Sequence, residues 1–324
     1  MFDVTPDDIR QLDDTDLRDL VGRLCEAELH DQGLSPAAVT YGGHQNAPDG
    51  GIDVRVDLSA PLPNQLSDNG FIPRPATGFQ VKAQKMPRAA IEQEMRPSGS
   101  VRSVIRDLAA EAGAYIIASS EEAVTDGARQ SRRNAMRYAV ADMPDADRLH
   151  VDFYDRTRLA TWVRQHPGVG LWVKEQIGSA VRGWRSYGPW SGAAEGTTGP
   201  FLPDEKLRIH LQSTNAPEPI TVVDAIDQLR TWLAQPKGCV RLVGLSGVGK
   251  TRLVQALFEA DIGARPLLPS LAVYTNLSDE PDPQPPGMIS DLIANQRLAV
   301  VIVDTALRIC TAGSRTFATL GIAP

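Results

Sequence analysis

The chain has 324 residues, of which 42% are hydrophobic, and a formal net charge of −7 at pH 7. This length predicts two domains, the apolar content argues against wholesale disorder, and the acidic balance restricts any nucleic-acid binding to a local basic patch. Three widely spaced cysteines favour reduced thiols, and the five histidines lack metal-ligand spacing. No apolar run is long enough to span a bilayer, so we expect a cytoplasmic protein without membrane contact.

The first half of the chain predicts one helix, three strands, and then helices that alternate with strands. Apolar residues at helical spacing indicate helices over 13–30, 101–112, 124–141 and 158–165. Short apolar or alternating runs indicate strands at 38–41, 52–58, 78–83, 114–118 and 149–154, with a proline-rich loop over 61–76. An antiparallel start followed by strand–helix–strand crossovers predicts an α/β fold, with a mixed sheet between flanking helices.

A second domain is expected after a stretch that is rich in turn-forming residues. Gly188–Pro203 contains mostly Gly, Pro, Ser and Thr around Trp190, which is typical of a linker. We therefore predict one domain over 1–170, a C-terminal helix and linker over 171–205, and a second α/β domain over 206–324. In the second domain we expect a helix over 224–234 and strands at 240–243, 271–274 and 298–304.

A phosphate-binding pattern, Gly-x-x-x-x-Gly-Lys-Thr, lies between the expected strand at 240–243 and a helix that begins at about Lys250. Its glycines allow a tight turn with several N–H groups pointing inward, and the positive end of the helix faces the same hollow. Lys250 would reach the outer phosphates of ATP, and the Thr251 hydroxyl would hold Mg²⁺. The predicted ATP-binding residues are Gly244, Ser246, Gly247, Val248, Gly249, Lys250, Thr251 and Asp304.

Asp304 ends the apolar strand expected at 298–304, and it resembles the Walker B carboxylate that holds Mg²⁺ through water. Thr305 follows it, where many hydrolysing NTPases place a second acidic residue. Only about 80 residues follow Gly244, so we expect a partial P-loop NTPase domain that hydrolyses ATP poorly.

A second set of polar residues lies on the strands of the first domain. Gln80 and Lys82 are two residues apart and project to one face, and pairing of the strands would bring Asp53 to them. Asp53 and the Val81 carbonyl would hold Mg²⁺, which would activate water for phosphodiester hydrolysis, while Lys82 would position that water or stabilise the developing charge. The alternative is that Asp53 and Lys82 are solvated strand residues that form an ion pair.

At these residues the chain resembles the restriction-endonuclease-like nucleases, the PD-(D/E)xK superfamily. Asp49-Gly50-Gly51-Ile52-Asp53 and Phe79-Gln80-Val81-Lys82-Ala83 are similar to the Mrr-type branch, in which Gln often stands at the acidic position before x-Lys. The resemblance covers roughly residues 10–170 and implies that Asp53, Gln80 and Lys82 are active-site residues. It also implies an active-site glutamate on the first helix, which is either Glu26 or Glu28.

A row of arginines on the helix expected at 124–141 is a candidate contact with double-stranded DNA. Phosphate contacts need a basic stripe of this kind, although an ordinary solvated helix face has the same pattern. The residues are Arg129, Arg132, Arg133 and Arg137.

The combination of this nuclease-like region, a linker and a Gly-Leu-Ser-Gly-Val-Gly-Lys-Thr loop resembles the bacterial anti-phage STAND proteins, which end in a sensor. The resemblance implies ATP-dependent assembly of a homo-oligomer that gates DNA cleavage. Similar proteins are expected to continue with Asn-Cys-Pro after Asp304, and one deleted base can yield Asp-Thr-Ala-Leu instead, so we expect a frameshifted, truncated product. The competing hypothesis is a non-catalytic ATP-dependent scaffold with an inactive restriction-like domain, which Gln80 in place of an acid favours.

Overall fold

The computed structural model describes residues 3–41, 51–59, 70–188, 206–211, 219–235, 238–245, 248–304, 308–311 and 316–323. The chain divides into two compact units, and the boundary between them lies between Arg164 and Gln165. This boundary precedes the one predicted at residue 170. Most of the predicted linker, from 189 to 205, lies outside the described residues.

The unit Asp3–Arg164 contains a five-stranded mixed sheet with the order β1-β2-β3-β4-β5. Its strands are β1 Val39–Tyr41, β2 Val54–Asp57, β3 Ala76–Lys82, β4 Ala114–Ser119 and β5 His150–Tyr154. The first three strands pair in antiparallel fashion, whereas β3, β4 and β5 are parallel. The predicted mixed α/β sheet is therefore confirmed, and its register places the start of β2 against the carboxyl half of β3.

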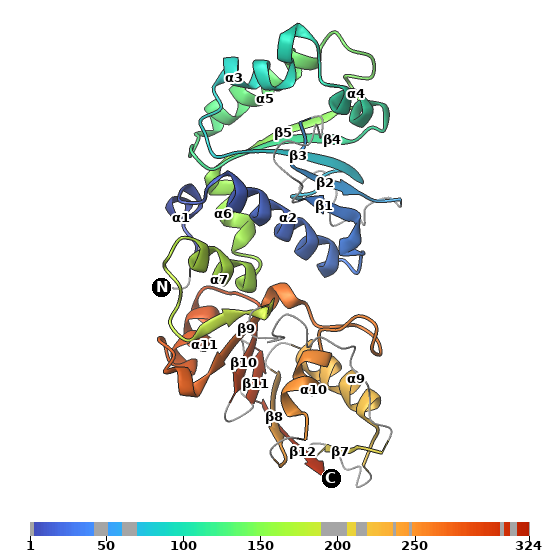
Figure 1. Cartoon of the computed structure of the whole chain (residues 1–324), viewed down its shortest axis with the longest axis vertical. Helices are drawn as coiled ribbons and strands as arrows, with labels where there is room; N and C mark the ends of the chain where they lie inside the picture. Colours follow the sequence, from blue (N-terminus) through green and yellow to red (C-terminus); the bar gives the residue numbers. More distant parts are fainter. Residues whose placement is uncertain are drawn as a thin grey trace. The chain divides into compact units, whose positions relative to one another are not determined.

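Helices lie on both faces of this sheet (Figure 1). One face carries α1 Pro6–Arg10, α2 Asp14–Asp31 and α6 Arg156–Val163, and the other carries α3 Arg88–Met95, α4 Ser103–Ala110 and α5 Asp126–Val140. Two short 3₁₀ helices are η1 Pro36–Ala38 and η2 Pro97–Gly99. The sequence predicted α2, α4, α5 and α6 but missed α1 and α3. Helix α3 has eight residues, lacks a side-chain N-cap and buries only Ile91 and Met95, so its amphipathic signal is short.

A cluster of aromatic side chains fills the space between the sheet and the α2 face. Phe71 stacks on Trp162 with the ring centroids 4.7 Å apart, and the Phe79 ring lies 6.1 Å from the same indole. The Tyr154 ring meets Trp162 edge-on at 6.4 Å. Because offset and edge-to-face aromatic pairs add to the free energy of burial, this cluster holds α6 against the sheet.

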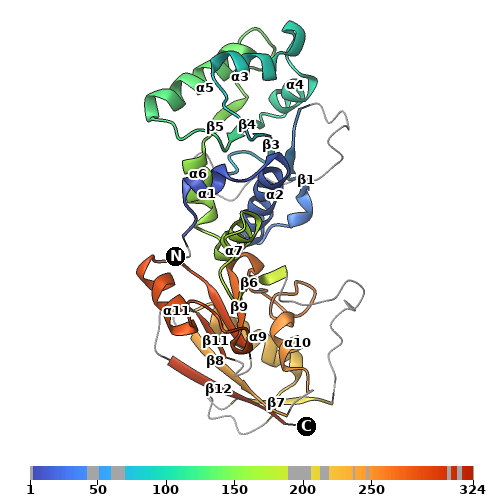
Figure 2. The same ribbon diagram turned by 60° about the vertical axis from the view of Figure 1, so that its left-hand side comes forward.

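The unit Gln165–Pro324 contains a seven-stranded sheet with the order β6-β9-β10-β11-β8-β12-β7. Its strands are β6 Trp184–Ser186, β7 Arg208–Leu211, β8 Gly238–Val243, β9 Ala272–Asn276, β10 Val300–Asp304, β11 Arg308–Thr311 and β12 Thr316–Ala323. Strand β11 is antiparallel to both β10 and β8, so β8 and β10 run in the same direction. The tail, for which the sequence predicted no element, supplies β11 and β12, and Figure 2 shows β12 beside β8.

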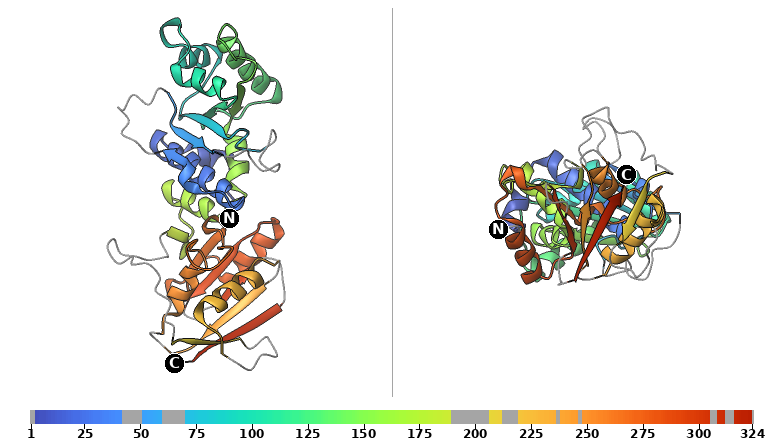
Figure 3. Two further views of the ribbon diagram at one scale, coloured as in Figure 1. Left: turned by 90° about the vertical axis from the view of Figure 1, so that its right-hand side faces the viewer. Right: turned by 90° about the horizontal axis from the view of Figure 1, so that it is seen from below.

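Helices also cover both faces of the second sheet (Figure 3). The helices are α7 Pro167–Gln176, α9 Val222–Leu233, α10 Lys250–Ala256 and α11 Pro285–Ala294, with 3₁₀ turns η3 Pro269–Leu271 and η4 Leu277–Asp279. Apolar residues of α9 and α10 share one core with Val240 and Ile302, whereas α7 and α11 share the other with Val273 and Val301. Helix α7, part of which was assigned to the linker region, therefore belongs to this unit. Among the described helices, none combines the length and apolar character that a membrane span requires.

Arg230 of α9 lies at the centre of the second unit and is only 1% exposed. Its guanidinium donates to five backbone carbonyls at and beyond the end of α10: those of Ala256, Leu257, Glu259, Ile262 and Ala264. The last carbonyls of a helix have no partner within the helix, and burying them unpaired is costly. A buried cation thus satisfies the carboxyl end of the helix that follows the phosphate-binding pattern.

Arg230→Met keeps most of the side-chain volume but removes every donor to those carbonyls. We expect the second unit to lose at least about 3 kcal/mol of unfolding free energy, since several buried acceptors become unpaired at about 1–3 kcal/mol each. Urea unfolding measures this loss. Arg182→Met is the control, because the Arg182 side chain is 67% exposed and pairs with exposed Glu280. Equal midpoints for both variants would contradict the role assigned to Arg230.

Candidate active site at the carboxyl end of β3

Asp53 reaches β3 because it immediately precedes β2. Its backbone N–H donates to the Phe79 carbonyl at 2.8 Å, and Val54 pairs with Phe79 in the antiparallel register. The Asp53 Oδ2 atom accepts hydrogen bonds from Gln80 Nε2 at 2.6 Å and from the Val81 N–H at 2.7 Å. The structure thus brings Asp53, Gln80 and Val81 together. Backbone atoms take part in two of these three hydrogen bonds, those with Phe79 and Val81.

Lys82 lies on the same face of β3 as Gln80, two residues further along the strand. Its Nζ atom is 3.1 Å from Glu94 Oε2 on α3. Arg102 holds the other oxygen of Glu94 at 2.8 Å and also donates to the Glu94 backbone carbonyl at 2.6 Å. The carboxylate beside Lys82 therefore comes from α3, which the sequence analysis did not find.

Helix α2 contributes a cation to this site. Arg18 Nε donates to Asp53 Oδ1 at 3.2 Å, and Arg18 Nη2 is 3.2 Å from the same oxygen. Both side chains are less than one fifth exposed. Sequence analysis missed Arg18 because it follows the core residue Leu17 directly, and helical periodicity alone does not distinguish it from other residues at the edge of the buried face.

Glu26 and Glu28 lie elsewhere, which corrects the expectation that one of them joins Asp53. They follow Arg18 on α2 by eight and ten residues, which places them about 12–15 Å further along the helix axis. Glu26 Oε2 accepts a hydrogen bond from Tyr41 Oη at 3.0 Å, and Glu28 Oε2 accepts one from Trp162 Nε1 at 3.0 Å. Burial raises the pKa of Glu26, against the opposing hydrogen bond from Tyr41.

On β3 and β4, two buried polar atoms have no hydrogen-bond partner among the described residues. They are Gln80 Oε1 and Tyr115 Oη, on side chains that are 4% and 0% exposed. Burial raises the pKa of the Tyr115 phenol, and the negative charges of Glu94 and Asp53 raise it further, whereas Arg102 lowers it. The phenol is therefore within electrostatic reach of both carboxylates.

The oxygen atoms at this site suit a hard divalent cation such as Mg²⁺. Asp53 supplies a carboxylate, and the unpartnered Gln80 Oε1 supplies an amide oxygen. Arg18, Gln80 Nε2 and the Val81 N–H already use the Asp53 oxygens, so a bound cation requires Arg18 to release Oδ1. Within the described part of the chain, no group of three or more His, Cys, Asp or Glu side chains is arranged so that it could hold a metal ion.

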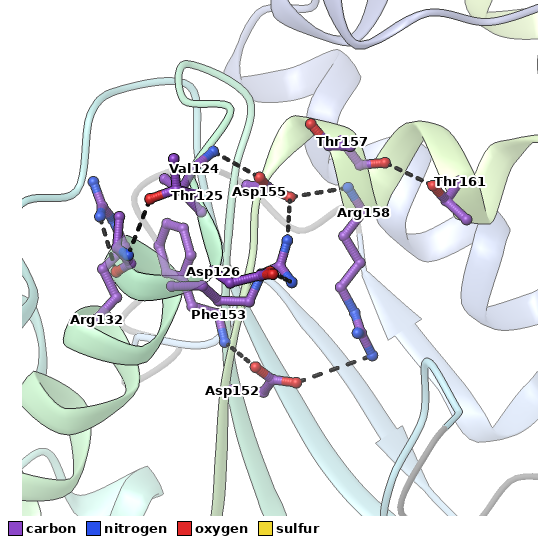
Figure 4. A network of polar contacts seen from close by, with 12 residues as sticks. Val124, Thr125, Asp126, Arg132, Asp152, Phe153, Asp155, Thr157, Arg158 and Thr161 are labelled. Atoms are coloured by element: carbon purple, nitrogen blue, oxygen red, sulfur yellow. Dashed lines mark hydrogen bonds and ion pairs between the residues drawn. The ribbon is translucent and has the colours of Figure 1, made fainter.

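The arginines expected to bind DNA are largely engaged by carboxylates of their own unit. Figure 4 shows Arg132 and Phe153 within this network of polar contacts. Arg132 pairs with Glu122 and lies over the Phe153 ring, 5.3 Å from its centroid. Arg133 Nε donates to the buried Asp152 at 2.5 Å.

Arg129 belongs to the same network through two carboxylates. It is 3.3 Å from Asp126 and 3.8 Å from Asp155, and Asp155 also accepts the backbone N–H groups of Val124 and Arg158. Arg137 is exposed, with no ion pair in the described region. The predicted four-residue stripe is thus reduced, because nearby acidic residues draw three of its arginines into a network between α5, β5 and α6.

The phosphate-binding pattern of the second unit leads from β8 into α10. Gly249 has φ of 82°, a left-handed conformation that favours glycine, and it forms the N-cap of α10. Lys250 Nζ donates to the Gly244 carbonyl at 3.1 Å and to the Leu245 carbonyl at 2.7 Å, so the lysine folds back over its own loop. Thr251 is exposed and Val248 half-buried, and the predicted residues Ser246 and Gly247 lie outside the described residues.

Asp304 lies at the same edge of the sheet as this loop. Strands β10 and β8 run in one direction, and Asp304 ends β10 while the loop begins where β8 ends. Asp304 Oδ2 accepts a hydrogen bond from Tyr274 Oη of β9 at 3.1 Å. Burial, the charge of Asp304 and this hydrogen bond together raise the pKa of Tyr274 to about 12.

Comparison with known proteins gives a similarity over about half of the chain. The chain is 28% identical over 173 residues to an exopolysaccharide phosphotransferase of Streptomyces coelicolor, and the match covers 49% of this chain. The match covers 29% of that protein, so the chain spans less than a third of its length. No family model matches the chain. No solved structure matches it.

Titration of the Tyr274 phenol tests its contact with Asp304, beside the phosphate-binding pattern of the second unit. A phenol with a folded pKa of about 12, above its ordinary value of about 10, stabilises the fold below pH 10 and loses that contribution as the pH rises through 12. Asp304→Asn should lower the pKa of Tyr274, though burial should keep it above 10. The measurement is the tyrosinate absorbance immediately after a pH jump, with the signal of Tyr274→Phe subtracted. An unchanged pKa in Asp304→Asn would show that the two side chains do not interact.

Proposed function

We propose that the protein is a Mg²⁺-dependent DNA endonuclease. In this proposal, Asp3–Arg164 is a restriction-endonuclease-like domain, and the second unit is an ATP-binding P-loop switch of the STAND type. The observation that supports the proposal is the contact of 2.6 Å between Asp53 Oδ2 and Gln80 Nε2 at the carboxyl end of β3, with Lys82 on the same face two residues further along. The resemblance to anti-phage proteins supports a role in bacterial defence.

The proposed cation would be held by Asp53, Gln80 Oε1 and the Val81 carbonyl. When bound, Mg²⁺ supplies Lewis-acid polarisation of a phosphodiester and lowers the pKa of a bound water. Lys82 would orient the attacking water or stabilise the charge that develops on the phosphate. Arg18 would transfer its guanidinium from Asp53 to a phosphate oxygen, for which its planar donors are suited.

Contact with the DNA backbone is proposed for exposed Arg137 and for the cations beside β3. The other arginines of the stripe are neutralised by Glu122, Asp152 and Asp155. Binding through a small number of phosphate contacts depends less steeply on salt than binding through a full stripe.

The nucleotide switch is proposed for the loop between β8 and α10. Lys250 is held by two carbonyls of its own loop, and the phosphates of ATP would give its ammonium a stronger, charge-assisted partner. Thr251 and Asp304 would hold the accompanying Mg²⁺. ATP-dependent assembly of several copies would then control cleavage by the first unit.

One contact favours the competing hypothesis of a non-catalytic scaffold. Arg18 occupies an oxygen of Asp53 that a metal would need. The matched phosphotransferase does not discriminate between the two hypotheses, because the chain covers only 29% of its length.

Plasmid nicking with Mg²⁺, with and without ATP, tests the nuclease. Asp53→Ala removes the chief carboxylate and Lys82→Ala the nearby ammonium, so each should lower nicking at least about a hundredfold. DNA binding in a gel shift should survive Asp53→Ala, whereas Lys82→Ala should weaken it by no more than one phosphate contact. Asp57→Ala and Lys85→Ala are matched controls, since both residues are exposed and lie outside the site. Cleavage by Asp53→Ala and Lys82→Ala at the rate of the controls would favour the scaffold.

Titration calorimetry with ATP and Mg²⁺ tests the switch. Lys250→Ala should weaken ATP binding at least about tenfold, because a hydrogen bond to a charged group contributes about 1.5–3 kcal/mol. Lys206→Ala is the control, since Lys206 is an exposed lysine of the same unit. Equal affinity in Lys250→Ala would remove the loop from the proposed ATP site.

A further inference from the structure

We propose that Glu94 is the second carboxylate of the divalent-cation site that Asp53 begins. The acidic side chain that is missing at Gln80 is then supplied by α3, from across the face of β3. This inference rests on the proposed nuclease function and names a further residue of the same site.

The two carboxylates flank neighbouring side chains of β3. Asp53 contacts Gln80 at 2.6 Å, and Glu94 contacts Lys82 at 3.1 Å. Gln80 and Lys82 are consecutive on one face of the strand. Asp53 and Glu94 therefore approach the same short segment of β3, one from the start of β2 and the other from α3.

Arg102 ties Glu94 to the turn that carries Asp53. Its guanidinium holds Glu94 Oε1 at 2.8 Å, and its side chain packs on Gly51, two residues before Asp53. A Cβ atom on Gly51 would lie only 2.6 Å from Arg102 Cδ, and the φ of Gly51 is 92°. A side chain at position 51 would therefore displace the Arg102 guanidinium, and the backbone conformation there favours glycine.

Two buried oxygens without a hydrogen-bond partner in the described region, on Gln80 and Tyr115, point to a ligand at this site. Gln80 Oε1 belongs to the amide that contacts Asp53, and it has no partner among the described residues. Tyr115 Oη also has no partner there and is within electrostatic reach of both Asp53 and Glu94. Buried oxygens without donors are unfavourable, and a hard cation bound by Asp53, Glu94 and Gln80 Oε1 would satisfy the amide oxygen.

The cations at the site neutralise both carboxylates in the absence of a metal. Arg18 pairs with Asp53, and Lys82 and Arg102 pair with Glu94. A divalent cation would take over this role, which frees Arg18 and Lys82 to face a phosphate.

The test is binding of Mn²⁺ to the full chain. The concentration of free Mn²⁺ is measured by electron paramagnetic resonance, and the affinities are compared with the rates of plasmid nicking. Glu94→Gln should weaken Mn²⁺ binding at least about tenfold and lower nicking, as Asp53→Asn should. Glu92→Gln is the matched control, because Glu92 lies on the same helix and pairs with exposed Arg88 at 2.7 Å. This control should bind Mn²⁺ as the parent does.

A second pair of variants separates a ligand from a structural partner of Arg102. Arg102→Gln removes the guanidinium but leaves the Glu94 carboxylate, so it should retain Mn²⁺ binding. If Glu94→Gln does not fold, Glu94→Asp keeps the charge and withdraws the carboxylate by one methylene, and it should still weaken binding. Parental affinity in a folded Glu94→Gln or Glu94→Asp would overturn the inference, as would equal losses in Glu94→Gln and Arg102→Gln.

The outcomes also separate this inference from the proposed function. Mn²⁺ binding that depends on Asp53 and Glu94, in a protein that does not nick DNA, would support the site and overturn the nuclease. Nicking that depends on Asp53 but not on Glu94 would support the nuclease and overturn the role of Glu94. Absence of Mn²⁺ binding by the parent would overturn the inference.

Discussion

The pairing of β2 with β3 fixes the candidate active site of the first unit. Asp53 donates its backbone N–H to Phe79 and receives the N–H of Val81 on its carboxylate, so the strands themselves locate the carboxylate. A slip of one residue in this register would turn the polar side chains of β3 to the opposite face. The positions of Gln80 and Lys82 relative to Asp53 therefore depend on sheet geometry more than on the preferences of individual side chains.

Ion pairs within the first unit determine which of its charged side chains remain available for binding. A buried or half-buried ion is stable only when a partner offsets its loss of hydration. Asp152 is 5% exposed and forms an ion pair with Arg133, while Glu94 forms ion pairs with Lys82 and Arg102. Arginines that look like a DNA-binding stripe in the sequence are thus partly used to neutralise internal acids. Arg18, Lys82 and Arg102 pair with Asp53 and Glu94, and a metal or a phosphate is proposed to exchange with them.

The two ends of helix α10 in the second unit are held by different kinds of contact. Arg230 satisfies five carbonyls around the carboxyl end of α10. At the other end of the same helix, Lys250 donates to two carbonyls of its own loop. Hydrogen bonds to neutral carbonyls are weaker than those to a charged phosphate, so Lys250 can change partners while Arg230 keeps the helix in place.

The sequence by itself determined the α/β class, the mixed sheet and most helices, because periodicity and turn residues act over a few neighbouring positions. It also singled out Asp53, Gln80 and Lys82, since strand alternation places the last two on one face. Tertiary structure alone decided which helix residues join them. Arg18 and Glu94 are ordinary charged residues in their own segments, and only the packing of α2 and α3 against the ends of β2 and β3 brings them to the site. The same reason places Glu26 and Glu28 elsewhere on α2: a sequence shows that a helix carries a carboxylate, whereas the contact of that carboxylate depends on which turn of the helix meets the sheet.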